Sequence, residues 1–244
     1  MRIAALYDVH GNFPALEAVL ADPRCAAADL IVSGGDLVAG PMPGECVDRL
    51  AGEGERVRYL MGNCDREAVW TTTDDPGFAE SMRWSAARLG ADRLGRVAQW
   101  PATVELGIDG LGTVLFCHGT PTSDTAIITS ATPEEDVAAE LAGVAGDLVV
   151  CGHTHVQYDR SVEDMRIVNA GSVGMPYEHS PDARWALIGG NGVELLSTPY
   201  DAAAALELLS SKGCPALDWF SRPLRGEVTA EEATAHFESR RRGA

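Results

Sequence analysis

The sequence lacks the features that mark several common classes of protein. Its six cysteines are scattered and form no CxxC pair, which argues against a zinc knuckle or a disulfide framework and favours a reducing compartment. No apolar run is long enough to span a bilayer, and the N-terminus shows neither a secretory nor a transit pattern. We therefore expect a cytoplasmic protein that makes no use of a membrane.

Positive charge is also scarce. Lysine and arginine together number 19 against 36 aspartates and glutamates, so the net charge is −17 at pH 7. Such a surface repels a polyanionic backbone, and no run of basic residues is wide enough to track a row of phosphates. We expect no long nucleic acid as a partner or substrate. No pattern in the sequence indicates an oligomeric state.

Neither a long Pro/Gly/Ser linker nor a repeat of fixed period divides the chain. Its 244 residues, 45% of them apolar, are enough to bury one substantial core. The sequence therefore predicts a single domain over residues 1–244. The amphipathic stretch at about 66–100 is a candidate helical cap, and a helical C-terminal segment is expected at about 201–244.

Hydrophobic periodicity predicts a layered α/β fold. Short apolar runs that end in turns alternate with helical patterns, which implies a parallel or mixed sheet with covered faces. The later short strands suggest a second sheet region dominated by hairpins. The predicted strand segments are 3–8, 28–36, 56–65, 102–109, 112–119, 147–155, 165–168, 184–188 and 193–197, and the predicted early helices are 12–21, 45–50 and 133–144.

Five short polar motifs fall at or just beyond the ends of predicted strands. In open α/β sheets the carboxyl ends of the strands converge on one crevice, so residues distant in sequence can share a site there. Adjacent glycines let the backbone turn sharply and approach an ion or a phosphate closely. The motifs are Asp8-Val-His10, Gly35-Asp36, Gly62-Asn63-Cys64-Asp65, His118-Gly119 and Gly152-His153-Thr154-His155.

These motifs offer carboxylate and amide oxygens and imidazole nitrogens. Four of the six histidines of the chain belong to the set. Seven ligands exceed the four of a structural zinc but suit two divalent ions that share a carboxylate and keep positions open for water. The candidate ligands are Asp8, His10, Asp36, Asn63, His118, His153 and His155.

With these motifs the sequence resembles the calcineurin-like metallophosphoesterase superfamily, in particular its small bacterial and archaeal phosphodiesterase-like branch. The resemblance extends over about residues 2–190 and includes Asn169-Ala-Gly-Ser-Val-Gly174, where Ala170 replaces the usual proline. It implies an α/β fold in which a double β-sheet sandwich is flanked by helices.

The resemblance also implies how the ligands divide between two ions. Asp36 would be the bridge, and Asp36, His10 and Asn63 would take part directly in catalysis. Two cations about 3.5–4 Å apart would share a hydroxide and clamp the phosphoryl oxygens for in-line attack. One ion would take Asp8, His10, Asp36 and His155, and the other Asp36, Asn63, His118 and His153.

One position departs from the family pattern. Many relatives have a histidine after the asparagine of the GNxD motif, where it is thought to help protonate the leaving group, whereas this chain has Cys64. A thiol at its usual pKa replaces histidine poorly, so we expect a preference for good leaving groups. Cys64 would then be a small filler, with His10 or a bound water as the alternative proton donor.

Asn12 has two interpretations. It follows Asp8-Val-His10-Gly11 directly and could orient a phosphate oxygen of the substrate. It also precedes the first predicted helix, where asparagine is a favoured N-cap. The sequence leaves both roles open.

The sequence thus predicts a metal-dependent phosphoesterase, most simply a phosphodiesterase acting on a small-molecule phosphate ester. The alternatives are a phosphomonoesterase or protein phosphatase, and a non-catalytic metal-binding scaffold of the same fold. Mixed nitrogen and oxygen ligands accept several divalent ions, among which we expect manganese first, with iron, nickel, cobalt or zinc as alternatives.

Overall fold

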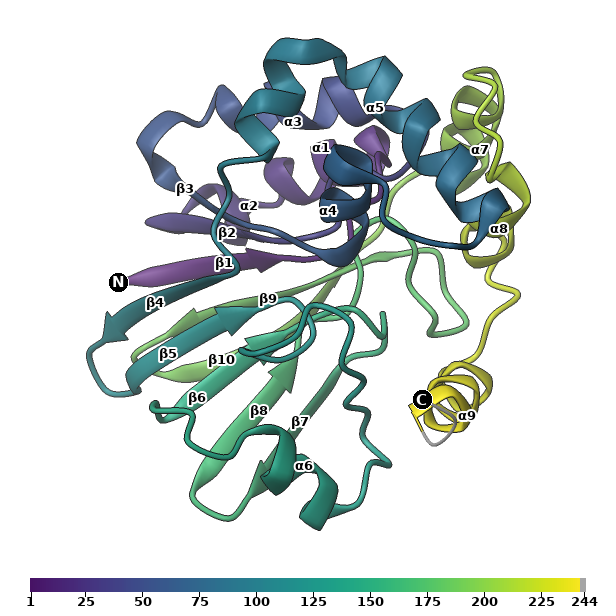
Figure 1. The fold of residues 1–244 in the computed structure, drawn as a ribbon. Coiled ribbons are helices and arrows are strands. Elements are labelled where there is room, and N and C mark those ends of the chain that lie inside the picture. The colour runs from purple at the N-terminus through teal and green to yellow at the C-terminus, as the bar shows by residue number, and fades with distance from the viewer. Residues whose placement is uncertain (242–244) are drawn as a thin grey trace.

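Two five-stranded sheets form the centre of the molecule (Figure 1). The structure is a computed structural model and describes residues 1–241. The strand order of the first sheet is β10-β9-β1-β2-β3, and that of the second is β4-β5-β6-β8-β7. The strands of the first sheet are β1 (Arg2–Leu6), β2 (Leu30–Gly34), β3 (Val57–Leu60), β9 (Ala183–Gly189) and β10 (Gly192–Thr198). Those of the second are β4 (Thr103–Ile108), β5 (Gly112–Cys117), β6 (Leu148–Cys151), β7 (Tyr158–Val162) and β8 (Met165–Asn169).

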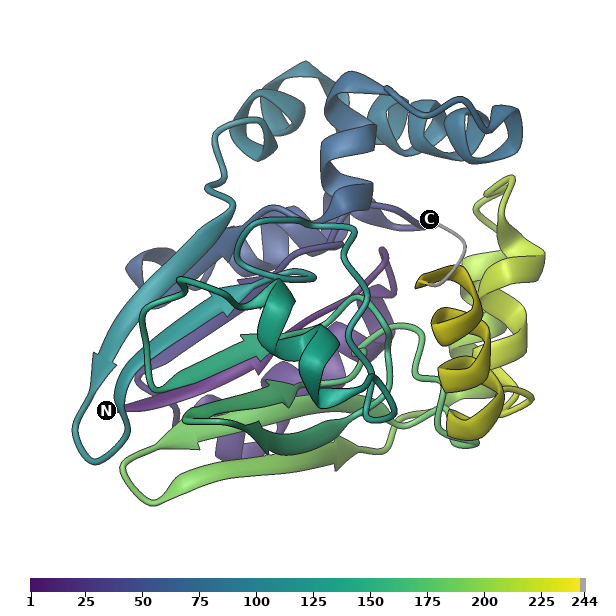
Figure 2. The ribbon, with the colours of Figure 1, turned by 60° about the horizontal axis from the view of Figure 1, so that its bottom comes forward.

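Helices cover the outer faces of the two sheets and one end of the sandwich (Figures 1 and 2). α1, α3 and α5 pack on the first sheet and α6 on the second, while α7, α8 and α9 lie beside the sandwich at the end of the chain. The helices are α1 (Phe13–Ala21), α2 (Pro23–Ala26), α3 (Pro43–Ala51), α4 (Asn63–Trp70), α5 (Pro76–Val97, kinked at Gly90), α6 (Glu134–Glu140), α7 (Ala202–Ser210), α8 (Leu217–Leu224) and α9 (Ala230–Arg241), with a 3-10 turn η1 (Gly54–Arg56).

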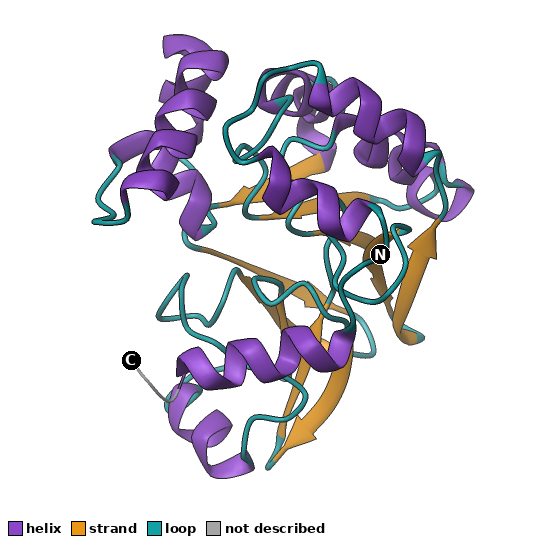
Figure 3. Ribbon diagram, turned by 90° about the vertical axis from the view of Figure 1, so that its right-hand side faces the viewer, coloured by secondary structure: helices purple, strands orange, loops and turns teal. Residues whose placement is uncertain are grey.

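Strand β1 shows why the molecule has layers. Its side chains alternate between two apolar clusters: Ile3 and Ala5 face the second sheet, whereas Ala4 and Leu6 face the helices. Because successive strand residues point to opposite faces, a strand covered on both sides must be apolar throughout. Figure 3 shows the strands between the outer helices. The predicted layered α/β fold with two sheets flanked by helices is confirmed.

The structure corrects two details of the predicted sheets. The strands predicted at 184–188 and 193–197 do not join a second, hairpin-dominated sheet, because β9 pairs antiparallel with β1 and so extends the first sheet. Strand β7, which the sequence analysis does not predict, pairs with β8 and forms the edge of the second sheet. Its sequence, YDRSV, contains three polar residues, as an exposed edge strand allows.

The helical stretches at about 66–100 and from about 201 onward contain α4, α5 and α7 to α9, while residues 242–244 lie outside the described part of the chain. Among residues 1–241, no helix combines the length and the apolar character needed to cross a bilayer.

Candidate metal centre

Five of the predicted ligands have left-handed backbone conformations. Their φ values are positive: 52° for Asp8, 49° for His10, 54° for Asp36, 66° for His153 and 58° for His155. Non-glycine residues rarely adopt this region, at a cost on the order of 1–3 kcal/mol each, and those that do cluster at functional sites. The surrounding structure therefore holds these loops in geometries that an unconstrained chain would avoid.

Backbone hydrogen bonds brace the first two of these loops against each other. The amide of Asp8 donates to the carbonyl of Gly35 over 3.1 Å, and the amide of His10 donates to the carbonyl of Asp36 over 2.8 Å. Since β1 and β2 are adjacent parallel strands, their carboxyl ends emerge side by side. The two carboxylates are brought together by this pairing.

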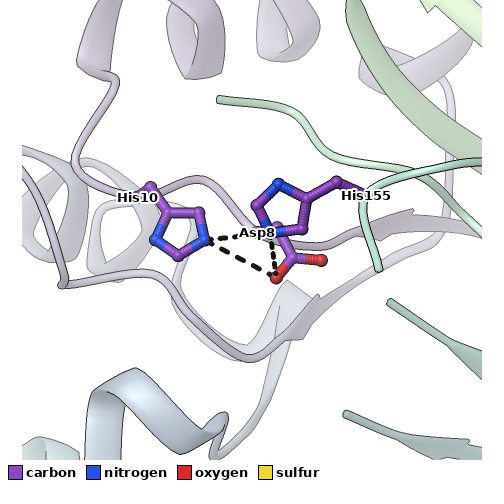
Figure 4. Close-up of side chains that lie close together, drawn as sticks. All are labelled: Asp8, His10 and His155. Carbon is purple, nitrogen blue, oxygen red and sulfur yellow. Dashed lines mark hydrogen bonds and ion pairs between the residues drawn. The ribbon is translucent and has the colours of Figure 1, made fainter. Parts of the chain in front are cut away.

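Asp8 lies at the centre of three imidazoles. Its Oδ2 accepts a hydrogen bond from the backbone amide of His153 over 2.9 Å. Its Oδ1 lies 3.3 Å from Nε2 of His155, 3.7 Å from Nε2 of His10 and 3.8 Å from Nε2 of His118. This oxygen is buried and has no hydrogen-bond partner among residues 1–241. Figure 4 shows the side chains of His10 and His155 beside the Asp8 carboxylate.

Asp36 faces two of the same imidazoles. Its Oδ1 accepts the backbone amide of Cys64 over 2.8 Å. Its Oδ2 lies 3.4 Å from Nε2 of His118 and 3.8 Å from Nε2 of His10. The Asp36 carboxylate therefore lies between the two histidines that the family resemblance assigns to different ions.

The remaining predicted ligands lie around His118. Oδ1 of Asn63 is 3.1 Å from Nε2 of His118. The ring of His153 packs edge-on against that of His118, with ring centroids 5.2 Å apart. The structure thus brings all seven predicted ligands into one cluster, although they come from the loops after five different strands.

Backbone carbonyls hold the other ring nitrogen of three histidines. Nδ1 of His10 lies 3.2 Å from the carbonyl oxygen of Ala39, Nδ1 of His118 lies 3.0 Å from that of Gly34, and Nδ1 of His155 lies 2.8 Å from that of Met175. A carbonyl can only accept, so Nδ1 carries the hydrogen in each ring. In a neutral imidazole this leaves the Nε2 lone pair free for a metal ion.

Charge and burial shift the pKa values of these groups in opposite directions. Burial raises the pKa of the Asp36 carboxyl, but the neighbouring His118 and His10 outweigh it, and the pKa is lowered. Burial lowers the pKa of His118, but the charges of Asp36 and Asp8 raise it to about 10. His10 and His153, where burial dominates, have pKa values lowered to about 4. His118 is therefore the protonated partner of the carboxylates in the metal-free protein.

Asp65, to which the sequence analysis assigned no role, braces the loops that carry Asp36 and Asn63. It is buried and accepts hydrogen bonds from the amides of Val38, over 3.0 Å, and Gly62, over 3.1 Å. Burial and the charge of Asp36 raise its pKa to about 7. The position of Asp65 in the Gly62-Asn63-Cys64-Asp65 motif was the sequence feature that could have indicated this role.

The predicted Asn169 motif supports the loop between β6 and β7. Nδ2 of Asn169 donates to the carbonyl of Gly152 over 2.6 Å and to the hydroxyl of Thr154 over 3.0 Å. The hydroxyl of Ser172 donates to the carbonyl of Asp8 over 2.8 Å. Ala170, in place of the usual proline, keeps a backbone amide that donates to the carbonyl of Cys151.

Asn12 is buried and caps α1. Its Oδ1 accepts the amide of Ala15 over 3.2 Å, and its Nδ2 donates to the carbonyl of Gly174 and to the hydroxyl of Tyr200. These contacts fit the capping interpretation and occupy both amide hydrogens. No free donor is left on this side chain for a phosphate oxygen.

Aromatic residues from α8, α9 and the loop between β8 and β9 pack around the histidines, and the sequence analysis missed them. Trp219 lies edge-on to His10, with ring centroids 5.3 Å apart, and Phe237 lies 6.1 Å from His153. Tyr177 stacks on His155 at 4.6 Å and 21°. These residues carry no motif, so only the fold could place them here.

The cluster fits a pair of divalent cations. Asp8, His10 and His155 form one group whose candidate ligand atoms lie within 4.8 Å of one another, and Asp8, Asp36 and His118 form a second. A buried carboxylate oxygen without a hydrogen-bond donor, surrounded by three imidazole nitrogens, is a costly arrangement unless a cation or proton compensates it. Mixed oxygen and nitrogen donors suit first-row divalent metals.

Comparison with known proteins agrees with this chemistry. A family model described as a calcineurin-like phosphoesterase superfamily domain matches residues 1–188. An uncharacterized protein of Methanocaldococcus jannaschii is 26% identical over 249 residues, covering 91% of this chain and 96% of that protein.

Solved structures show the same arrangement of strands and helices. The crystal structure of a metallophosphoesterase from Sphaerobacter thermophilus has a TM-score of 0.74 at 27% identity and covers 93% of this chain and 99% of that one. A hypothetical protein from Pyrococcus horikoshii has a TM-score of 0.79 at 17% identity, covering 93% and 98% of the two chains. The latter likeness concerns the fold alone.

Proposed function

Because the chain belongs to the calcineurin-like phosphoesterase superfamily and is a hydrolase of phosphate esters, we propose that it hydrolyses a small phosphodiester with the help of two divalent cations. The observation that carries this proposal is the position of the two buried carboxylates. Oδ1 of Asp8 and Oδ2 of Asp36 both face imidazole Nε2 atoms that backbone carbonyls hold in place from the other side of the ring.

The proposed ligand sets follow the predicted division, with Asp36 as the bridge. Oδ2 of Asp36 faces both His10, which belongs to the first set, and His118, which belongs to the second. When bound, two such ions lower the pKa of water and neutralise the charge of the phosphoryl oxygens. We propose manganese first, with iron, nickel, cobalt or zinc as alternatives. The sets are Asp8, His10, Asp36 and His155 for one ion, and Asp36, Asn63, His118 and His153 for the other.

The residues of the chain contribute orientation and charge. The amides of Cys64 and His153 each occupy one oxygen of a carboxylate, so Asp36 and Asp8 direct their other oxygen into the cluster. Holding ligands in a fixed geometry before binding avoids the cost of arranging them during the reaction. The positive φ angles of Asp8, Asp36 and His153 also belong to loops that are held in one geometry before a metal ion binds.

The surroundings of Cys64 favour a diester with a good leaving group. The thiol is buried in an apolar cluster with Ala39, Met82 and Phe78. Burial, together with the charge of Asp36, raises the pKa of this thiol well above its usual value. A group that holds its proton so tightly is a poor general acid near neutral pH.

We propose that a single domain over residues 1–244 carries this activity and that the helical stretch at 66–100 forms one wall of the site. Phe78 and Met82 of α5 line a cavity of about 370 Å³ that Ala39 also lines. A small-molecule substrate suits cavities of this size. The net charge of −17 supports the view that long nucleic acids are not substrates.

We also propose a cytoplasmic location. All six cysteines are buried and unpaired within the described residues. Free thiols throughout are typical of proteins in a reducing compartment.

Metal-stripped protein, assayed before and after addition of Mn²⁺, tests the proposal. Bis(p-nitrophenyl) phosphate would be the diester, with p-nitrophenyl phosphate as the monoester. We expect Mn²⁺ to restore turnover of the diester and to favour it over the monoester. Preferred turnover of the monoester would support a phosphomonoesterase instead. No turnover of either ester by protein with two bound metals would support the scaffold alternative.

A further inference from the structure

We propose that the cavity between α5 and α8 binds a neutral aromatic substituent of the phosphate ester. This inference rests on the proposed function, because it assumes that the phosphoryl group lies at the metal centre. It adds a substrate class to that function: esters in which the phosphate carries a flat, uncharged ring system.

The cavity shares a wall with the metal centre. Ala39 and Gly40 line it, and the carbonyl of Ala39 is the partner of Nδ1 of His10. Trp219 also lines the cavity, and its ring lies edge-on to that of His10. A substituent of a phosphate bound beside His10 therefore has this space within reach.

The lining selects an uncharged and apolar group. The cavity has a volume of about 370 Å³ and is lined by Phe78 and Met82 of α5 and by Trp219 and Phe220 of α8. Among the described lining residues, Asp218 is the sole charged side chain, and it is negative. A second phosphate or a carboxylate on the substituent would find no cation here and would be repelled.

Trp219 is positioned to stack on a ring. Its side chain is 41% exposed although neighbouring residues hold it in place. The ring of Phe220 packs edge-on against that of Trp219, with centroids 5.2 Å apart, and the ring of His10 packs edge-on against it at 5.3 Å. An aromatic side chain whose orientation is already held loses little conformational entropy when a ligand stacks on it.

A second cavity, of about 450 Å³, lies on the side of His118 and offers a different chemistry. Arg66 and Trp70 line it, together with hydroxyl side chains of the loop at 120–123. Arg66 pairs with Asp124 at 2.6 Å. Trp70 and Trp100 make part of this lining aromatic, but Arg66, Asp124 and the hydroxyls also give it charge and hydrogen-bonding groups. We assign the uncharged substituent to the cavity between α5 and α8, whose described lining contains no cation.

Binding of phosphonates to manganese-loaded protein tests the assignment without requiring turnover. Phenylphosphonate, cyclohexylphosphonate and methylphosphonate share an anionic group but differ in the substituent, and isothermal titration calorimetry would give each dissociation constant. We expect phenylphosphonate to bind about tenfold more tightly than methylphosphonate, because stacking of one ring on an aromatic side chain increases affinity by about this factor. Equal binding of the cyclohexyl and phenyl compounds would overturn the aromatic assignment.

Variants at two exposed tryptophans locate the effect. Trp219→Ala should abolish the preference for phenyl over methyl, and Trp219→Phe should retain most of it. Trp70→Ala, which removes an exposed tryptophan from the other cavity, is the matched control and should leave the preference intact. Loss of the preference in Trp70→Ala, or its persistence in Trp219→Ala, would overturn the proposal.

Failure of this inference is distinguishable from failure of the proposed function. If manganese-loaded protein hydrolyses the diester but shows no phenyl preference, the aromatic subsite alone is wrong. If it neither hydrolyses the diester nor binds any of the phosphonates, both proposals are wrong.

Discussion

Nε2 of His118 lies 3.4 Å from Oδ2 of Asp36, and both side chains are buried. Without a metal ion this is an ion pair in which His118 carries a proton. With a metal ion in the proposed position, the same two atoms would become ligands.

Replacing Asp36 by Asn should remove metal and activity together. The amide keeps a similar shape but takes away the negative charge that faces His10 and His118. We expect a fall in kcat/KM of at least about a hundredfold, as for loss of a group that stabilises charge in the transition state. Elemental analysis of the purified variant should show fewer than two metals per chain.

Asp159→Asn is the matched control, because Asp159 is a surface residue that pairs with Arg166 away from the site. It should keep both metals and full activity. Full turnover with two metals in Asp36→Asn would show that Asp36 is not the bridge.

Metal binding should release a proton from His118. Burial lowers the pKa of this histidine, but Asp36 and Asp8 raise it to about 10, so it is protonated in the metal-free protein at pH 7.5. A histidine must be neutral to bind a metal. We expect release of about one proton per chain, and an affinity for Mn²⁺ that increases up to about tenfold per pH unit below pH 10.

Calorimetric titrations in two buffers of different ionisation enthalpy would count the released protons. His10 and His153, whose pKa values are lowered to about 4, are already neutral and should add none. A His118→Gln variant provides the control, since its titration should show no such release. Absence of proton release in the unmodified protein would contradict the assignment of His118 as a ligand.

Cys64→His should broaden the range of leaving groups. An imidazole can protonate a departing alkoxide near neutral pH, which the buried thiol, with its raised pKa, does poorly. We expect kcat/KM for poor leaving groups to rise about tenfold or more relative to good ones, which a series of substituted phenyl esters would measure. The larger ring should also lower the free energy of unfolding by about 1–3 kcal/mol.

Cys64→Ser tests whether any polar group at this position suffices. It should leave the dependence on leaving-group pKa unchanged. The same unchanged dependence in Cys64→His would show that position 64 does not determine the leaving group.

Glu238→Ala should loosen α9. The buried carboxylate accepts hydrogen bonds from the hydroxyls of Thr129 and Thr132 and pairs with Arg241 at 3.0 Å. Loss of these partners should reduce the free energy of unfolding by about 1–3 kcal/mol, measured by urea denaturation. Faster hydrogen exchange in α9, but not in β1, would show that the effect is local.

Glu231→Ala on the same helix provides a control, because Glu231 is exposed. It should change the free energy of unfolding by less than about 0.5 kcal/mol. Similar exchange rates in α9 for Glu238→Ala and the parent protein would contradict the anchoring role of Glu238.

Much of the site was predictable because its residues follow strands. Asp8, Asp36 and His118 each come directly after or shortly after an apolar run, and the parallel pairing of β1 with β2 brings the first two to one edge of the first sheet. Residue type then indicated the chemistry, since carboxylates and imidazoles suit divalent metals. These inferences need only local sequence and one general property of sheets.

The pairing of distant strands was not predictable in the same way. The patterns at 184–188 and 193–197 indicated strands correctly, but periodicity does not say which sheet a strand joins. Strand β7 was missed because its polar residues disguise an edge strand. Both cases depend on partners far away in the sequence.

Asn12 and Trp219 show the same division between local and long-range information. An asparagine before a helix indicates a cap, and α1 uses it so, but its contacts with Gly174 and Tyr200 depend on segments more than 160 residues away. Trp219 has no motif at all and acquires its place beside His10 only when α8 packs against the end of the sandwich.

Local chemistry along the chain was thus sufficient for the class of fold, the kind of metal ligand and the departure at Cys64. Folding alone decided which oxygen of Asp8 remains without a donor and what lines the cavity between α5 and α8. The physical reason is that periodicity and residue type are short-range properties. Distances between side chains on different loops depend on how the whole set of strands and helices packs.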